Sequence, residues 1–493
     1  MQQPRRAGQR DARWLALVIL CLGDLMIVLD STIVGVALPT IRADLGFSAS
    51  ALAWVVNGYL LTYGGFLLLG ARLGDLFGHR RMFLGGLVLF TLASLGCGLA
   101  RAGWLLVAAR AVQGLGGAVV SAVGLALVAG LFTEPGERAR AMGVFGFVSA
   151  GGGALGSLLG GVLTGALGWH WVFLVNIPIG AATCALSLAV LPPGRAAAGG
   201  RLDVAGAVTV TAALLLAVAA ILGGRDGGWT LGLLGAAAAL LAAFLVIEAR
   251  VRAPLVPLGI FRRRNVTASG AIGVLWAAAM FAWFFLAALY LQLVLGYSPL
   301  RVGLAFLPSD LIMGALSLGA SARIVARFGV RAPLAAAMLL VAVGLALFAR
   351  APVGGAFVAD VLPGMVLLGV GAGVAFNPLL LAAMGDVAPE ESGLASGVIN
   401  TAFMMGGALG LALLASLAAA RTGALRAAGA GALAALNGGY HAAFLAGAAC
   451  AGAAAVIGAV GLRAVAAPEE RDGREQRAVV STAHRGLSAG ENR

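Results

Sequence analysis

The sequence predicts an all-α polytopic membrane protein, because its composition, its hydropathy and the lengths of its apolar stretches all indicate this class. Of its 493 residues, 61% are hydrophobic and only 11% are charged, and its mean hydropathy is +1.00. Soluble domains are roughly 45 to 50% apolar and about 25% charged. A helix needs about 20 apolar residues to cross about 30 Å of hydrocarbon. The chain therefore has room for more than a dozen spans and none for a large extramembrane domain.

Fourteen apolar stretches, each bounded by charged residues, proline or glycine, are expected to be transmembrane helices. They lie at 14–38, 51–70, 82–100, 103–132, 141–167, 171–191, 204–223, 229–248, 266–295, 302–321, 332–349, 361–384, 394–420 and 440–463. The first stretch is longer than the apolar region of a signal peptide and lacks a small-residue cleavage site, so we expect it to be retained as the first span.

The distribution of arginine predicts the orientation of these spans. The chain has no lysine, and with the N-terminus inside the cell 25 of its 33 arginines fall in cytoplasmic segments and 7 outside. Cytoplasmic loops carry the excess of positive charge in membrane proteins, so both termini are predicted to be cytoplasmic. The net charge of +13 then reflects topology, and no nucleic-acid partner is expected. The high alanine and glycine content indicates a GC-rich bacterial genome and hence the bacterial cytoplasmic membrane.

Segments in the first part of the chain recur in the second part at a nearly constant spacing. The segments 44–48, 71–80 and 152–156 recur at 294–298, 322–331 and 406–410, at offsets of 250, 251 and 254 residues. Spans 1 to 6 therefore correspond to spans 9 to 14, as in secondary transporters built from two related halves around a binding site. The predicted organisation is a cytoplasmic tail (1–13), a six-helix bundle (14–191), two inserted helices with linkers (192–265), a second six-helix bundle (266–463) and a disordered cytoplasmic tail (464–493).

Four charged residues lie well inside predicted spans rather than at their ends, where charge is costly and usually functional. They are Asp24 and Asp30 in span 1, Arg110 in span 4 and Asp310 in span 10. From the helix rise, Asp30 and Asp310 lie about 12 Å, and Arg110 about 9 Å, below the outer ends of their helices, so the three can share one layer. A buried carboxylate beside a guanidinium can change its protonation with water access, as proton coupling requires. The alternatives are a static Asp30–Arg110 ion pair, and an Asp24 that snorkels or caps a helix turn.

The repeat predicts different functions for the two halves. At an offset of 250, Asp30 corresponds to Met280, and the counterpart of Arg110 falls within 361–365, which contains no charged residue. We therefore expect the proton chemistry in the N-terminal half, with Asp30 as the main proton-coupling carboxylate. Substrate contacts and gating are expected to involve the second half.

Asp310 is the only acidic residue within the predicted spans of the second half. An uncompensated carboxylate in a membrane must be protonated, paired or matched to a substrate. Phe281, Trp283 and Phe284 in span 9 could offer aromatic faces to a desolvated organic cation. The sequence therefore predicts a cation site. The alternative is that Asp310 pairs with a group in span 1 or span 4 and only shapes the proton site.

Charge complementarity predicts a gate between the halves on the cytoplasmic side. The loop between spans 12 and 13 is acidic and contains no arginine; its acidic residues are Asp386, Glu390 and Glu391. Its expected partner is Arg80 or Arg81 of the loop between spans 2 and 3. Asp75 is expected near the start of span 13, because a helix N-terminus favours an anion. The alternative is that all of these are solvated surface charges.

Several segments carry more specific motifs. They are 29–39 in span 1, 72–81 between spans 2 and 3, 110–116 in span 4 and 169–180 entering span 6. Together they resemble the fourteen-helix drug/proton antiporter family (DHA2, EmrB/QacA type) of the major facilitator superfamily. The span 4 segment matches the proton-linked motif of that family without departure, whereas Gly35 stands where the span 1 motif usually has asparagine. This resemblance implies a proton-coupling role for Gln113 and a gating role for Gly78.

Span 5 has the glycine spacing of the antiporters, at Gly143, Gly152, Gly156, Gly160 and Gly161. Ser157 replaces the proline that normally follows the third of these glycines. The resemblance therefore implies antiport but leaves open whether the helix has the usual kink.

The resemblance implies the major facilitator fold and proton-coupled efflux of amphipathic small molecules, such as an antibiotic, another drug or a secondary metabolite of the host, by alternating access. The partners are then the lipid bilayer, protons and a drug-like substrate, and the chain is expected to be monomeric. No metal or other cofactor is expected, since the proton gradient drives transport, and the scattered histidines give no catalytic set. The alternatives are a proton-linked transporter of lipids or other metabolites, or a channel or receptor, although a channel would need repeated polar rings.

Overall fold

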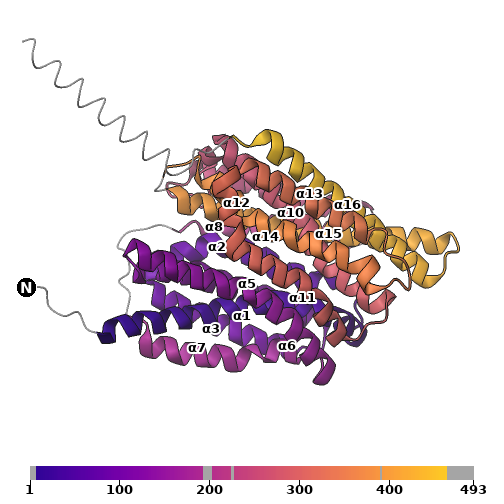
Figure 1. The fold of residues 1–493 in the computed structure, drawn as a ribbon, viewed down its shortest axis with the longest axis horizontal. Helices are drawn as coiled ribbons and strands as arrows, with labels where there is room; N and C mark the ends of the chain where they lie inside the picture. The colour runs from indigo at the N-terminus through magenta and orange to yellow at the C-terminus, as the bar shows by residue number, and fades with distance from the viewer. Residues whose placement is uncertain (1–6, 193–201, 224–226, 389–390, 464–493) are drawn as a thin grey trace, which may run out of the picture.

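The computed structural model describes residues 7–192, 202–223, 227–388 and 391–463. Fourteen helical segments in these ranges are long and apolar enough to cross a membrane, and the regular elements of these ranges are all helical (Figure 1). The fourteen spans predicted from the sequence are thus confirmed. Glu390, the C-terminal tail and the first six residues of the N-terminal tail lie outside the described residues.

The first half of the chain forms seven helices and one short 3₁₀ turn. These are α1 (Ala7–Leu45), η1 (Ala51–Ala53), α2 (Trp54–Phe77), α3 (His79–Gly98), α4 (Gly103–Leu131), α5 (Pro135–Ala166), α6 (Trp171–Leu174) and α7 (Asn176–Val190). We call the end of the bundle at which α1 begins the N-face, and the end at which α1 finishes the opposite face.

The remaining elements comprise the inserted pair and the second half. The inserted pair is α8 (Val204–Leu222) and α9 (Gly227–Arg250). The second half contains η2 (Leu258–Arg262), α10 (Arg264–Leu289), η3 (Tyr290–Val294), α11 (Pro299–Ala315), η4 (Leu316–Ala320), α12 (Ser321–Phe328), α13 (Arg331–Phe348), η5 (Phe357–Val361), α14 (Leu362–Met384), α15 (Ser392–Ala427) and α16 (Ala432–Gly461).

The helices extend further than the apolar stretches do. Only Gly78 separates α2 from α3, with a φ of 90° that favours glycine, so the predicted loop between spans 2 and 3 is largely helical. Span 10 likewise continues from α11 through the π-helical η4 into α12. Charged residues at the membrane surface do not interrupt a helix, whereas apolar patterns end at them, which explains the difference.

The two halves pack their helices in the same way. In the first half α1 packs on α5, α2 on α4, and α3 on α7; in the second half the corresponding pairs are α10 with α15, α11 with α14, and α13 with α16. The internal repeat seen in the sequence is therefore present in three dimensions. Asp30 and Met280 occupy matching positions in α1 and α10 under this correspondence.

Two helix pairs join the halves, α2 with α15 and α5 with α11. The inserted helix α8 packs against both α2 and α15, and α9 packs against α8. The α5–α11 contact is concentrated toward the opposite face, where a Cβ on Gly161 would lie 2.8 Å from the carbonyl oxygen of Pro299. Toward the N-face α5 and α12 separate (Figure 1), and a Cβ on Gly143 or Gly146 would meet no atom within 4 Å.

Candidate functional site

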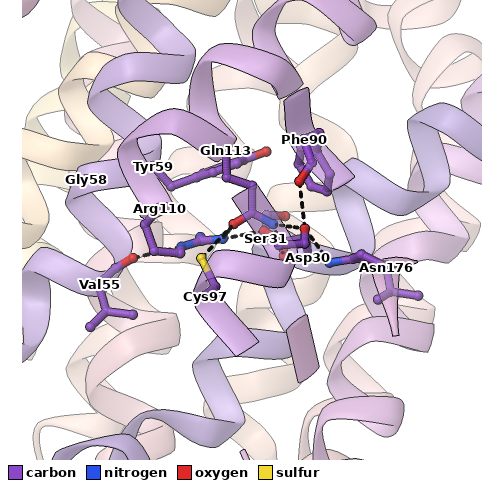
Figure 2. Close-up of polar contacts among 12 residues, drawn as sticks. Asp30, Ser31, Val55, Gly58, Tyr59, Phe90, Cys97, Arg110, Gln113 and Asn176 are labelled. Carbon is purple, nitrogen blue, oxygen red and sulfur yellow. Dashed lines mark hydrogen bonds and ion pairs between the residues drawn. The ribbon is translucent and has the colours of Figure 1, made fainter. Parts of the chain in front are cut away.

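The most deeply buried charges form one ion pair near the middle of the N-terminal half. A guanidinium nitrogen of Arg110 on α4 donates to Oδ2 of Asp30 on α1, and the two side chains are 1% and 0% exposed. Figure 2 shows the pair surrounded by residues of several helices. The structure thus brings together the two groups that helix depth placed in one layer.

Two amide side chains complete the coordination of the Asp30 carboxylate. Nε2 of Gln113 and Nδ2 of Asn176 donate to Oδ1 of Asp30 over 2.8 Å and 3.0 Å. Oε1 of Gln113 accepts from Arg110 over 2.7 Å, and Nε2 of Gln113 also donates to the hydroxyl of Ser94 over 2.7 Å. Gln113 lies one helical turn after Arg110, so one face of α4 presents both groups. Ser94 and Asn176 were not predicted as site residues; Asn176, a polar residue inside an apolar span, was the available signal.

The guanidinium of Arg110 is held by further contacts on α2 and α6. Its Nε donates to the carbonyl oxygen of Val55 over 3.0 Å, and its Cζ lies 4.4 Å from the centroid of the Tyr59 ring and 5.7 Å from that of Phe173. A buried ion pair is stable only when the remaining hydrogen-bonding groups of both partners are satisfied. These contacts hold the Arg110 guanidinium in place beside the Asp30 carboxylate.

Two polar atoms beside the ion pair have no hydrogen-bond partner among the described residues. They are the hydroxyl of Tyr59, which contacts Arg110 with its ring, and Oδ1 of Asn176, which binds Asp30 through its nitrogen. Most buried polar groups in proteins are hydrogen-bonded. These atoms can bind a water molecule that reaches the site.

Asp24 lies outside this cluster. It is six residues before Asp30, which turns it about 240° around α1, and it accepts a hydrogen bond from the hydroxyl of Ser149 on α5. Its side chain is 7% exposed. Asp24 is therefore a second buried carboxylate, bound to α5 and directed away from Arg110.

Asp310 on α11 also binds a serine of α5, across the interface between the halves. The hydroxyl of Ser157 donates to Oδ2 of Asp310 over 2.8 Å, and the two residues are 3% and 2% exposed. The partner is thus neither a span 1 nor a span 4 group, as the alternative interpretation required. Ser157 is the residue that replaces the usual proline, and α5 runs as one uninterrupted helix through it.

The predicted aromatic residues of span 9 separate into two groups. Trp283 is 1% exposed and packs with Phe284 against Phe306, its ring centroid lying 4.5 Å and 5.6 Å from theirs. Trp283 therefore belongs to the core of the second half in this structure. Phe281 is partly exposed and its ring lies 5.9 Å from that of Phe403 on α15.

Phe403 is the centre of an aromatic cluster that the sequence did not predict. Its ring centroid lies 5.1 Å from that of Trp276 on α10 and 6.1 Å from that of Phe376 on α14. Phe281, Phe376 and Phe403 are all partly exposed. We call these residues and Trp276 the aromatic cluster. Helix rotation, which the sequence pattern did not resolve, decides which rings face one another.

The predicted gate residues bind within their own halves. Arg80 donates to the carbonyl oxygen of Leu188 on α7 over 2.5 Å, and Asp75 lies 3.4 Å from the His79 ring nitrogen. Asp386 accepts from the backbone N–H of Asn265 at the start of α10 over 3.0 Å. Arg81 and Glu391 are exposed. The structure thus brings none of the described acidic residues of this loop to Arg80.

Four of the five predicted antiporter glycines lie at close helix contacts. A Cβ on Gly152, Gly156 or Gly160 would collide with α1, and one on Gly161 would collide with α11. Gly143 has open space around it. Small residues let membrane helices approach closely, so the glycines place α5 between the two halves. No group of histidine, cysteine, aspartate or glutamate among the described residues could hold a metal ion.

Comparison with known proteins identifies the family. The model of the Major Facilitator Superfamily matches residues 20–411. The chain belongs to this superfamily. It is therefore a multi-pass cell membrane transporter and not an enzyme.

Members of this superfamily from antibiotic-producing bacteria are similar over most of the chain. The puromycin resistance protein pur8 of Streptomyces alboniger is 39% identical over 84% of this chain and 84% of its own length. The cephamycin export protein CmcT of Amycolatopsis lactamdurans is 39% identical over 85% of this chain and 87% of its own. Among solved structures, the nucleoside transporter NupG has the same fold, with a TM-score of 0.65 and 11% identity over 90% of this chain and 98% of its own.

Proposed function

We propose that this superfamily member exports amphipathic small molecules in exchange for protons, with Asp30 as the proton carrier. The observation that carries the proposal is the fully buried Asp30–Arg110 pair with its amide partners Gln113 and Asn176. Export is supported by relatives whose names describe puromycin resistance and cephamycin export. We propose no cofactor, because a proton gradient supplies the energy, and a monomer as the transporting unit.

The proton step follows from the charge balance of the site. Three donors and one positive charge stabilise the ionised carboxylate of Asp30. Protonation removes the attraction to Arg110 and turns one acceptor oxygen into a donor. The amides of Gln113 and Asn176 must then rearrange, and since they come from α4 and α7, the packing of these helices against α1 responds. Asp24, bound to Ser149 on α5, is a second proton-binding candidate.

The orientation proposed from the arginine distribution places the N-face in the cytoplasm. The α5–α11 contacts at Gly161 and Gly303 then close the outer side, and α5 and α12 separate on the cytoplasmic side. This arrangement corresponds to the substrate-loading state of an alternating-access cycle. The reverse state requires the Ser157–Asp310 hydrogen bond to break.

For the substrate site we propose Asp310 together with the aromatic cluster around Phe403. Phe281 belongs to this cluster, whereas Trp283 and Phe284 pack against Phe306 in the core of the second half. A cationic substrate would replace the Ser157 hydroxyl as the partner of the carboxylate, and aromatic faces would stabilise its charge. Substrate loading would then weaken the bond that closes the outer side.

For the gate we propose that the loop 2/3 residues Asp75, Gly78, Arg80 and Arg81 meet the acidic loop of the second half only when the N-face closes. The supporting observations are that Arg80 binds only a backbone oxygen of α7 and that Arg81 and Glu391 are exposed. Glu390 belongs to the same proposal, although it lies outside the described residues.

Everted membrane vesicles provide the test of the overall function. Vesicles containing the full-length protein are acidified by respiration, and puromycin or a cationic dye is then added. We expect the added compound to release protons from the vesicle interior and to accumulate there, with neither effect in vesicles lacking the protein. Accumulation without proton release would overturn proton coupling, and the absence of both for every amphipathic compound tried would overturn export.

A further inference from the structure

A cavity lies between the two halves at the opposite face, away from the proton site and from the aromatic cluster. Its volume is about 200 Å³. Its walls come from the end of α1 and from η1 in the first half, and from α10, α15 and α16 in the second. No step of the proposed transport cycle uses this cavity.

Two arginines reach this cavity from different halves. Arg42 lies near the end of α1 and Arg426 in the last turn of α15. Only 7 of the 33 arginines are expected on this side of the membrane. Two of these seven line the same cavity and give it positive charge. Nε of Arg42 donates to the carbonyl oxygen of Phe47 over 3.3 Å. Arg426 has no ion-pair partner among the described residues and is exposed.

A tyrosine also lines the cavity. Tyr440 on α16 is 4% exposed, and its hydroxyl has no hydrogen-bond partner among the described residues. Arg42 is close enough to affect it electrostatically. The cavity thus contains unused hydrogen-bond donors on three side chains, Arg42, Arg426 and Tyr440. No carboxylate of the described residues lines it, so an anion would complete its charge balance.

Below these donors the walls are apolar. Phe285 and Leu289 of α10 and Ala415 and Ala418 of α15 line this part. Ala415 lies eleven residues before Arg426 on the same helix, so the apolar wall extends about 16 Å from the charged rim toward the membrane centre. From the membrane surface toward the membrane centre, the cavity is therefore first polar and then apolar. The head group and the chains of a membrane lipid follow one another in the same order and at the same depth.

The volume of the cavity favours one end of a lipid over a whole drug-sized molecule as its ligand. Cavities that enclose a drug-sized ligand have volumes of about 300 to 1,000 Å³, larger than the 200 Å³ present here. The rim is open, since Gly423 and Arg426 are exposed. A molecule that inserts only one end, while the rest stays in the bilayer, fits this shape.

We propose that this cavity binds an anionic phospholipid, with its phosphate between Arg42 and Arg426 and the start of an acyl chain along α10 and α15. Basic pockets between transmembrane helices are known to bind anionic head groups. The bound lipid joins the two halves at the face where they are closed, because its ligands come from both. This inference does not depend on which compound the protein exports.

The test measures lipid binding to the purified full-length protein in detergent. Phosphatidylglycerol is titrated and bound lipid is counted by native mass spectrometry, with phosphatidylcholine as the comparison. We expect phosphatidylglycerol to bind more tightly than phosphatidylcholine. Arg42→Gln and Arg426→Gln should each weaken phosphatidylglycerol binding about tenfold or more, as expected for losing one charged hydrogen bond.

Two further variants test whether binding depends on this cavity or only on the positive charge of this face. Arg301→Gln removes another arginine of the same face, one whose guanidinium lies 3.8 Å from the centroid of the Tyr297 ring, and it should bind phosphatidylglycerol like the unmodified protein. Ala419→Phe narrows the cavity without changing charge, and it should weaken binding while the protein elutes as a monodisperse species. Equal loss in Arg301→Gln would mean that only general surface charge attracts the lipid and would overturn the proposal.

Inorganic phosphate distinguishes a lipid site from a free-anion site. Phosphate at millimolar concentration should compete poorly, because it gains nothing from the apolar walls. Full displacement of phosphatidylglycerol by phosphate would contradict the role of the acyl chain. Tight binding of phosphatidylglycerol to the Arg42→Gln/Arg426→Gln double variant would overturn the proposal altogether.

Discussion

The two halves share one helix arrangement but differ in what they bury at matching positions. The first half buries a charged and amide-rich cluster around Asp30 and Arg110. In the second half the matching residue of α10 is Met280, which is 6% exposed, and Met365 in the region that corresponds to Arg110 is fully buried. Aromatic rings occupy the second half instead. One fold therefore supplies a first half with a buried charged cluster and a second half with an aromatic one, and the halves meet where α5 packs on α11 and α2 on α15.

The largest effect is expected from removing the charge that distinguishes the first half. Asp30→Asn cannot release a proton, so proton-driven efflux in vesicles should fall to background. Leaving Arg110 without its counter-charge also costs stability, about 3 to 5 kcal/mol for a buried pair. The Asp30→Asn/Arg110→Gln double variant should recover stability but not transport.

Asp44→Asn is the matched control for that experiment, because it changes an aspartate of the same helix that accepts a hydrogen bond from the Trp169 ring nitrogen over 2.9 Å. It should transport normally. Wild-type efflux by a well-folded Asp30→Asn protein would remove Asp30 from the proposed mechanism.

The second half should not tolerate the charge that the first half requires. Met280→Asp places a carboxylate at the matching position of α10 with no arginine beside it, which we expect to lower stability by about 3 kcal/mol or more. Met280→Leu, which nearly conserves volume, should cost less than about 1.5 kcal/mol. Thermal unfolding in detergent measures both. Equal stability of the two variants would show that the halves do not differ in the way described.

Substitution of Asp310 tests whether the second half selects cationic substrates. Asp310→Asn should remove resistance to monovalent and divalent cationic drugs while keeping resistance to neutral compounds, because the amide can still accept from Ser157 but carries no charge. Growth inhibition by a panel of cationic and neutral drugs measures this. Equal loss for every compound would instead assign Asp310 to the coupling machinery.

Two serines of α5 allow a hydrogen bond between the halves to be compared with a hydrogen bond within the first half. Ser157→Ala removes the bond to Asp310 across the interface, and Ser149→Ala removes the bond to Asp24 inside the first half. Hydrogen bonds between membrane helices contribute about 0.6 to 2 kcal/mol, so Ser157→Ala should shift the ratio of conformations by about 3-fold to 30-fold.

Spin labels at Leu167→Cys and Arg301→Cys, near the opposite-face ends of α5 and α11, report this ratio as a distance distribution. We expect Ser157→Ala to increase the population of long distances and Ser149→Ala to leave it unchanged. If the two serine variants behave alike, the Ser157–Asp310 bond has no special role in closing the outer side.

The smallest effect is expected at the N-face, where the loop between spans 2 and 3 is basic and the loop between spans 12 and 13 is acidic. In a protein without its native cysteines, Arg81→Cys and Glu391→Cys should crosslink in a minority of molecules, because Arg81 and Glu391 are both exposed in the structure described. Crosslinked molecules should not transport. If no crosslink forms at any pH or with any substrate, these residues are surface charges and the proposed gate is wrong.

Local properties of the sequence were sufficient for the fourteen spans and for part of the site. A span needs a continuous apolar stretch, so the fourteen spans follow from composition along the chain. Asp30 and Arg110 could be placed at one depth because helix rise converts residue number into distance. The family motif around Arg110 then directed attention to Gln113. The proposed domain boundaries depend on the repeat and stay a prediction.

Only the tertiary structure decided which way each side chain faces. Helix depth did not distinguish Asp24, which faces α5, from Asp30, which faces Arg110. Nor could it place Trp283 in the core and Phe281 beside Phe403.

The partnership of Ser157 with Asp310, and the convergence of Arg42 and Arg426 on one cavity, join residues more than 150 positions apart in the chain. A transmembrane helix is apolar on most of its surface, so its sequence contains little information about its rotation. Packing against the neighbouring helices determines that rotation. This packing creates the Asp30–Arg110 cluster, the bond between the halves and the cavity at the opposite face.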